Sequence, residues 1–290
     1  MHTAALKAAG LQGEYVECPI KPNSLGESVH GLAQLDDLQD GITDWWNKGR
    51  LLDGFNVTMP FKSKAYVWVQ NKGEELKSVA NTMHVVNTVR MEGKRSVGYN
   101  TDRLGFGVPL KELNLENTSA IVLGAGGAAR SVGVALGLDA KVRKIMIWNR
   151  TPDNAKSTAN ALSSVFKFLD CKVELGTSVD LKSLAVEKST LLVNATPMGQ
   201  QGKDDVPAEL LERLHKGQVV YDIVYEPRET KLIREARKRG CRVITGDEML
   251  AGQGAEAFKI WTGKDRALDG TSILDVMKSV LNRHFAEHAS

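Results

Sequence analysis

The sequence is poor in cysteine and has no long apolar run. Cys18, Cys171 and Cys241 are far apart, odd in number and form no Cys-x-x-Cys pair in the 290 residues, which argues against a disulfide framework and against a zinc or redox motif. No stretch approaches the ~20 apolar residues of a membrane-spanning helix, and the N-terminus lacks the apolar stretch of a signal peptide. We therefore expect a cytoplasmic protein with no membrane partner and no bound metal.

The chain also lacks a dominant charge. It has 38 Lys+Arg against 35 Asp+Glu and a formal net charge of +3, and its longest basic cluster is the short one from Arg234 to Arg239. Nucleic-acid binding normally requires a concentrated basic face, so we expect no nucleic-acid partner. At roughly 100–200 residues per domain, the length fits one large domain or two ordinary ones.

The first hundred residues mix helical and extended patterns, as expected of one mixed α/β unit. The expected elements are a helix over residues 1–10, an extended run at 15–20, helices near 31–39 and 43–51, a strand, turn and helix around 54–62, and two strands at 84–91 and 96–99.

From Ser119 onward, short apolar strands alternate with helical segments. The strands begin with SAIVL and continue with KIMIW, KVEL, TLLVN, QVVYD and RVIT, and two further helices end the chain. Strands separated by helices predict a parallel, doubly wound sheet with helices on its faces.

A glycine-rich turn follows the first of these strands. Gly124, Gly126 and Ala129 form a Gly-x-Gly-x-x-Ala pattern between SAIVL and a helix, where small residues let the backbone approach the pyrophosphate of a dinucleotide. The alternative is a turn with only a packing role. No Lys-Ser or Lys-Thr follows the glycines, which excludes a P-loop.

The end of the next strand distinguishes between the dinucleotides. An NAD site usually has Asp or Glu there, whereas this chain has Asn149, Arg150 and Thr151. Without an acid, a guanidinium can hold the 2′-phosphate, which favours NADP. The alternative is a solvated arginine at a strand end.

Hydride transfer to a carbonyl also needs a group that exchanges a proton with the hydroxyl formed. Lys62, at the end of GFNVTMPFK, and Asp102, at the end of GYNTD, fall at element ends where open α/β sheets bind ligands. A lone lysine is otherwise usually a solvated surface residue.

Together these motifs resemble those of the shikimate dehydrogenase family, including its quinate/shikimate dehydrogenases. The matching segments, in the family's order, are GFNVTMPFK, VVNT, NTD, VLGAGGAARS, NRT, NATPMG, DIVYEPRETKL and GDEMLAGQGAEAFKIWTG. They cover most of the chain.

The resemblance implies a role for each matching position. Lys62 and Asp102 would form the catalytic pair, and the substrate would bind to Thr58, Asn87, Asp102, Tyr225 and Gln253. The residues implied to hold NADP are Gly124, Ala125, Gly126, Gly127, Ala128 and Ala129 at the pyrophosphate, Asn149, Arg150 and Thr151 at the adenosine phosphate, and Thr196, Met198, Ile223 and Gly246 at the nicotinamide.

The resemblance further implies two domains with a cleft between them. Residues 1–102 and 247–290 would form a mixed α/β substrate domain, and residues 103–246 a Rossmann doubly wound NADP domain. The implied reaction is NADP-dependent interconversion of shikimate and 3-dehydroshikimate in aromatic amino-acid biosynthesis, by a monomer or homodimer. The alternatives are a quinate/shikimate dehydrogenase-like paralogue with an altered substrate, and a catalytically weak sensor that binds the dinucleotide or a shikimate-like ligand.

Several positions depart from the family pattern. The family's first strand and Ser-x-Ser-Pro segment do not precede the helix at Met1, so we expect this chain to be less stable and less active than a form extended upstream. Arg103 stands where the family commonly has Gly, and Asn154 stands where many NADP-using members have a second arginine. His284, Glu287 and His288 match the zinc pattern His-x-x-Glu-His, but no third ligand follows.

Overall fold

The computed structural model describes residues 1–17, 52–58, 61–93, 95–167, 169–176 and 186–288, in two compact units. The first unit comprises Met1–Thr101 and Ala255–Val276, and the second comprises Asp102–Gly254 and Met277–Ser290. Cys18 and the helices expected near 31–39 and 43–51 lie outside the described residues.

The first unit contains a four-stranded mixed sheet. Its strands are β1 (Gly54–Asn56), β2 (Glu75–Leu76), β3 (Thr88–Glu92) and β4 (Arg95–Tyr99), in the order β1-β3-β4-β2. Strands β3 and β4 form the expected antiparallel pair, while β2 is parallel to β4. β3 begins later than expected because His84, with φ 53°, ends the preceding helix in the left-handed conformation.

Three helices accompany this sheet: α1 (His2–Ala8), α3 (Lys62–Asn71) and α4 (Ser78–Met83). The expected strand, turn and helix around 54–62 correspond to β1 and the start of α3. Helix α3 buries Ala65, Trp68 and Val69, whose spacing places them on one face of the helix. They form a core with Val89 of β3 and with Val86, which lies just before that strand. This packing fixes the start of α3, where Lys62 lies.

The extended run expected at 15–20 forms no strand over its described residues, 15–17. The Tyr15 ring instead stacks on the His2 ring at 4.2 Å between centroids, and its hydroxyl donates to Asn56 Oδ1 at 2.9 Å. Side-chain contacts therefore hold this part of the chain against α1 and β1, in place of a backbone ladder.

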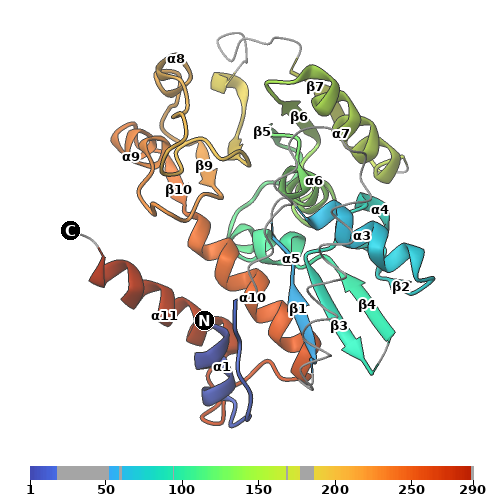
Figure 1. Cartoon of the computed structure of the whole chain (residues 1–290). Coiled ribbons are helices and arrows are strands. Elements are labelled where there is room, and N and C mark those ends of the chain that lie inside the picture. The colour runs from blue at the N-terminus through green and yellow to red at the C-terminus, as the bar shows by residue number, and fades with distance from the viewer. Residues whose placement is uncertain (18–51, 59–60, 94, 168, 177–185, 289–290) are drawn as a thin grey trace. The chain divides into compact units, whose positions relative to one another are not determined.

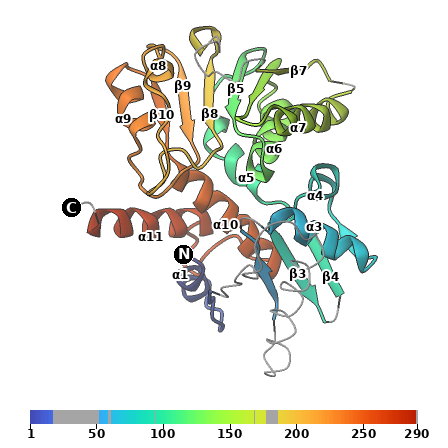
Figure 2. The ribbon, with the colours of Figure 1, turned by 45° about the horizontal axis from the view of Figure 1, so that its top comes forward.

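The second unit contains the predicted parallel sheet. Its strands are β5 (Ser119–Leu123), β6 (Lys144–Trp148), β7 (Lys172–Leu175), β8 (Leu191–Asn194), β9 (Val219–Asp222) and β10 (Arg242–Ile244). Their order is β10-β9-β8-β5-β6-β7, with every neighbouring pair parallel. Figure 2 shows β10, β9, β8 and β5 side by side. The strand order reverses at β5 and β8, as in a doubly wound dinucleotide-binding sheet, so the predicted fold class is confirmed.

Helices connect these strands, as the sequence predicted. They are α6 (Gly127–Val134), α7 (Pro152–Val165), α8 (Ala208–Leu211) and α9 (Lys231–Lys238), with a π-helical turn at Ala135–Asp139 and a 3-10 turn at Val186–Lys188. Helix α5 (Asp102–Gly107) and a 3-10 turn at Pro109–Glu112 precede the first strand of this sheet. Strands β8 and β9 are buried along their whole length, as expected of central strands covered on both faces.

Two helices near the end of the chain contribute to both units. The first is α10 (Gly246–Thr262), the long orange helix of Figure 1, and the second is α11 (Ile273–Glu287). The expected domain boundary after residue 246 lies at the start of α10, whereas the division between the units falls inside that continuous helix. Later residues of α11 group with the second unit, where Lys278 pairs with Glu248 at 2.7 Å. The functional assignment of the two domains stays a prediction.

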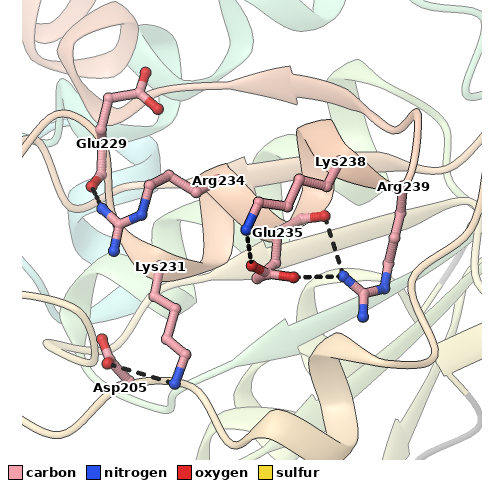
Figure 3. Close-up of polar contacts among 7 residues, drawn as sticks. All are labelled: Asp205, Glu229, Lys231, Arg234, Glu235, Lys238 and Arg239. Atoms are coloured by element: carbon pink, nitrogen blue, oxygen red, sulfur yellow. Dashed lines mark hydrogen bonds and ion pairs between the residues drawn. The ribbon is translucent and has the colours of Figure 1, made fainter.

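The basic cluster on α9 is paired with acidic side chains. The pairs are Lys231 with Asp205, Arg237 with Glu229, and Lys238 and Arg239 with Glu235, most of them drawn in Figure 3. Arg234 donates to the backbone carbonyl of Glu229. These cations therefore do not form a face of unopposed positive charge. Separately, no helix within the described ranges is long and apolar enough to cross a membrane.

Candidate active site

The glycine-rich turn lies at the reversal of strand order in the second unit. Gly124 has φ +115°, and a Cβ atom there would lie 2.7 Å from the Ala195 carbonyl oxygen, so both its conformation and its surroundings require glycine. Gly126 precedes the first residue of α6, and a Cβ atom there would meet nothing within 4 Å. The open space in front of Gly126 and the N–H groups of the first helical turn fit a pyrophosphate.

Two hydrogen bonds hold this turn in place. The Gly124 N–H donates to the Trp148 carbonyl at 2.7 Å, and the Thr158 hydroxyl on α7 donates to the Ala125 carbonyl at 2.9 Å. The other residues predicted to contact the pyrophosphate are Gly127 and Ala128, which open α6, and the buried Ala129. The turn is thus tied to the end of β6 and to the helix that follows it.

The residues predicted to bind the adenosine phosphate lie directly after β6. Arg150 is exposed, and Asn149 donates from Nδ2 to the Thr151 carbonyl at 3.1 Å. Thr151 is the N-cap residue of α7, and Pro152 is its first residue. Because Gly124 is bonded to Trp148, the structure brings this segment and the glycine-rich turn to the same edge of the sheet.

The residues predicted to face the nicotinamide follow three adjacent strands. Thr196 and Met198 lie in the loop after β8, Ile223 follows β9, and Gly246 follows β10. A Cβ atom on Gly246 would lie 2.5 Å from the Ile223 carbonyl oxygen, so these two segments are in direct backbone contact. The structure therefore gathers these four residues at the carboxyl ends of β8, β9 and β10.

Beneath these loops lies a buried polar network that the sequence predictions missed. Asn194 ends β8 and Asp222 ends β9, and Asn194 Nδ2 lies 2.9 Å from Asp222 Oδ1. The Thr230 hydroxyl donates to Asp222 Oδ2 at 2.7 Å. The sequence did contain a signal for this network, namely Asn and Asp at the ends of otherwise apolar strands. A buried polar side chain in such a position needs a hydrogen-bond partner.

The first unit holds three of the predicted substrate and catalytic residues. Lys62 is the first residue of α3, Thr58 follows β1 and is exposed, and Asn87 precedes β3 and is buried. The Val57 N–H donates to the Asn87 carbonyl at 2.8 Å, and the Val86 N–H donates to the Lys62 carbonyl at 3.0 Å. Backbone bonds thus bring the segments of all three residues together.

The side chain of Asn87 is fixed by Thr101. Asn87 Nδ2 donates to the Thr101 hydroxyl at 3.1 Å, and the Thr101 N–H donates to Asn87 Oδ1 at 2.8 Å. Thr101 directly precedes Asp102. The motifs VVNT and NTD, separated in the sequence, are therefore joined by paired hydrogen bonds.

Asp102, Gln253 and Tyr225 belong to the second unit. Asp102 is the first residue of α5 and is buried, while Tyr225 is exposed. Gln253 lies on α10, where a Cβ atom on Gly105 would come within 2.4 Å of its backbone nitrogen. This close approach of α5 and α10 places Gln253 beside the helix that Asp102 begins. Lys62 and Asp102 lie in different units, so their pairing stays a prediction.

Arg103, a departure from the family pattern, and the His-x-x-Glu-His segment both have specific partners. The Arg103 guanidinium pairs with Asp139, with Nε 2.9 Å and Nη2 2.5 Å from its carboxylate oxygens. His288 Nδ1 lies 2.7 Å from the His284 carbonyl oxygen. One of the ring nitrogens of the His-x-x-Glu-His segment is therefore engaged in a hydrogen bond to the backbone. Among the residues that the structure describes, no three His, Cys, Asp or Glu side chains gather as metal ligands.

Comparisons with known proteins agree with these features. A family model described as "Shikimate 5'-dehydrogenase C-terminal domain" matches residues 246–265. The NADP(+)-dependent shikimate dehydrogenase of Methanothermobacter thermautotrophicus is 34% identical over 285 residues, which cover 98% of this chain and 92% of that protein.

Solved structures give the same result. A crystal structure of a shikimate dehydrogenase in complex with NADP+ has a TM-score of 0.79 at 30% identity, covering 98% of this chain and 89% of that one. The shikimate 5-dehydrogenase of Thermus thermophilus, in complex with NADP(H) and shikimate, has a TM-score of 0.73 at 30% identity, covering 97% of this chain and 92% of that one. The predicted resemblance is confirmed, and the chain belongs to the shikimate dehydrogenase family.

Proposed function

We propose that this protein is an NADP-dependent shikimate dehydrogenase that interconverts shikimate and 3-dehydroshikimate. The observation that supports this most strongly is the similarity along 98% of the chain to an NADP(+)-dependent shikimate dehydrogenase. The parallel sheet, with its glycine-rich turn at the reversal of strand order, agrees with it. We further expect the enzyme to act in the cytoplasm, as a step toward the aromatic amino acids, and as a monomer or homodimer.

The cofactor would bind along the carboxyl edge of the six-stranded sheet. The turn from Gly124 to Ala129 holds the pyrophosphate, Asn149, Arg150 and Thr151 hold the 2′-phosphate, and the loops after β8, β9 and β10 face the nicotinamide. NADP supplies the hydride acceptor when shikimate is oxidised and, as NADPH, the hydride donor in the reverse direction. The residues of this chain orient both reactants and move the proton.

Lys62 would exchange the proton of the reacting hydroxyl, with Asp102 as its partner. In oxidation, the Lys62 amine takes the hydroxyl proton while the carbon loses hydride, and in reduction the ammonium returns that proton. Thr58, Asn87, Gln253 and Tyr225 would bond the other polar groups of the substrate. Because buried polar groups left unpaired are costly, such a set of partners discriminates against analogues that lack a hydroxyl.

The function is tested by following NADPH absorbance with shikimate and, separately, with quinate. We expect NADPH to form with shikimate, in proportion to enzyme concentration. Turnover of quinate alone would instead identify a quinate-preferring paralogue. If NADPH formed with neither substrate while NADP still bound, the protein would be a sensor and the enzymatic proposal would be wrong.

Arg150→Ala tests the choice of dinucleotide. Because Arg150 is exposed after β6, its removal leaves the fold intact but deprives the 2′-phosphate of a charge-assisted partner. We expect the KM for NADP to rise by about tenfold or more, while the KM for NAD changes little, because a hydrogen bond to a charged group contributes roughly 1.5–3 kcal/mol.

Lys156→Ala is a matched control for Arg150→Ala. Lys156 is another exposed cation near the start of α7, and its removal changes the net charge by the same amount. We expect it to raise the KM for NADP by much less than Arg150→Ala does. An equal rise in the two KM values of Arg150→Ala, for NADP and for NAD, would show that Arg150 does not bind the phosphate.

A further inference from the structure

The Asp222 carboxylate joins three segments of the second unit. It has no exposed surface, and its Oδ1 accepts from Asn194 Nδ2 at 2.9 Å and from the Val224 N–H at 3.1 Å. Its Oδ2 accepts from the Thr230 hydroxyl at 2.7 Å. These partners come from the end of β8, from the loop after β9 and from the N-cap position of α9, so one side chain connects three elements.

The connection continues into the loop after β8. Asn194 Oδ1 accepts from the Thr196 hydroxyl at 2.6 Å and from the Thr196 N–H at 3.1 Å. The Thr196 hydroxyl in turn accepts from the Met198 N–H at 3.1 Å, and the Met198 carbonyl accepts from Asn194 Nδ2 at 2.9 Å. Thr196 and Met198 are therefore positioned through Asn194, which Asp222 orients.

The loop after β9 is held by the same carboxylate. Val224, whose N–H binds Asp222, directly follows Ile223, and the Ile223 carbonyl lies against Gly246. Thr196, Met198 and Ile223 thus belong to segments that Asp222 holds directly or through Asn194, and Gly246 lies against the second of these segments.

We propose that Asp222 is a positioning residue for the nicotinamide half of NADP, and that its ionised form fixes the loops after β8 and β9 for cofactor binding. The inference rests on the proposed function, since it takes Thr196, Met198, Ile223 and Gly246 as the nicotinamide side. Asp222 does not touch the cofactor and acts through Asn194 and Val224.

The ionisation of Asp222 makes this role dependent on pH. Burial raises the pKa of its carboxyl to about 6, although hydrogen bonds from Thr230, Val224 and Asn194 each lower it. These three partners are uncharged, and Lys231, the residue after Thr230, is directed to Asp205 (Figure 3). Above pH 6 the carboxylate accepts three hydrogen bonds, and below pH 6 one of its oxygens carries a proton and holds the loops less firmly.

Stability and cofactor binding should respond to this proton in opposite directions. A pKa above that of an exposed aspartate means that folding favours the protonated form. This contribution to stability is complete below about pH 4 and is lost as the pH rises through about 6. The same rise in pH produces the carboxylate that orders the loops, so tighter NADP binding accompanies a less stable fold.

Asp222→Asn tests the proposal because it keeps Oδ1 as an acceptor and resembles the protonated aspartate. At pH 8 we expect the dissociation constant of NADP to rise by about three- to tenfold, with a melting temperature equal to or above that of the wild type. The affinity for 2′,5′-ADP, which lacks the nicotinamide half, should not change. Between pH 8 and 5.5, NADP affinity should fall more in the wild type than in the variant. The 2′-phosphate of NADP itself titrates near pH 6, but it does so equally with both proteins, so the comparison between them removes its effect.

Two outcomes would overturn the proposal. One is an unchanged NADP affinity in Asp222→Asn, and the other is an equal loss for NADP and 2′,5′-ADP, which would indicate a general structural role. If the wild type forms NADPH from shikimate in either case, the proposed function stands and only the role of Asp222 is wrong.

Thr230 provides a second test that leaves Asp222 in place. Thr230→Val removes the hydroxyl that donates to Asp222 Oδ2, and Thr230→Ser keeps it. We expect Thr230→Val to weaken NADP binding severalfold with no change in 2′,5′-ADP binding, and Thr230→Ser to restore the wild-type value. Equal NADP affinities in the two variants would contradict the proposal.

Discussion

We expect Lys62→Met to lower kcat for shikimate oxidation by about 10²–10⁴-fold, because it removes the group that we propose takes the proton from the reacting hydroxyl. Methionine keeps most of the length and apolar volume of the lysine stem. Lys62 is the first residue of α3 and is half-buried, so the core face of that helix is not altered. Stopped-flow or steady-state absorbance of NADPH measures the loss. NADP binding, which we assign to the second unit, should remain at the wild-type level.

Lys72→Met is the matched control for this substitution. Lys72 is the C-cap residue of the same helix, and its ammonium lies 4.2 Å from the centroid of the Trp68 ring. We expect kcat to stay within about twofold of the wild type, since the contact is a surface cation–π interaction worth about 0.5–1 kcal/mol of stability. A Lys62→Met enzyme with a similarly small change would show that another group exchanges the proton.

Gly124→Ala and Gly126→Ala are both expected to weaken NADP binding, but for different reasons. At Gly124, the added methyl group meets the Ala195 carbonyl oxygen at 2.7 Å in a backbone conformation that L residues rarely adopt. We expect a loss of about 1–3 kcal/mol in the free energy of unfolding, with cofactor binding lost as the turn moves. Thermal unfolding of the protein without NADP measures the first effect.

At Gly126, the methyl group meets no protein atom within 4 Å. We expect the melting temperature of the protein without cofactor to stay within a degree or two of the wild type, because nothing in the fold is displaced. The methyl group stands where we propose that the pyrophosphate approaches the backbone, so the dissociation constant of NADP should rise by about tenfold or more. Tight NADP binding by Gly126→Ala would place the pyrophosphate elsewhere.

Local sequence patterns were sufficient where one segment carried all the information. The strand, glycine turn and helix around Gly124 could be predicted because apolar residues and small residues follow one another within a dozen positions. The same holds for the alternating strands and helices from Ser119 onward, whose periodicity reports burial directly. The pair of β3 and β4 was predicted too, because a short turn joins them.

Other features depended on residues far apart in the chain. The partner of Arg103 is Asp139, and the partner of Tyr15 is His2 together with Asn56. Neither pairing has a spacing that a sequence motif would reveal. Tyr15 was therefore expected in an extended run, whereas its side-chain contacts set the conformation of this part of the chain.

The sequence by itself determined the family, the parallel sheet and the position of the glycine-rich turn, because these follow from local patterns and from motifs that lie in order along the chain. Only the tertiary structure revealed the network around Asp222 and the division between the two units inside helix α10. The reason is physical: a buried carboxylate can be placed only when strands distant in sequence bring its donors within hydrogen-bond distance, and that depends on the packing of the whole sheet.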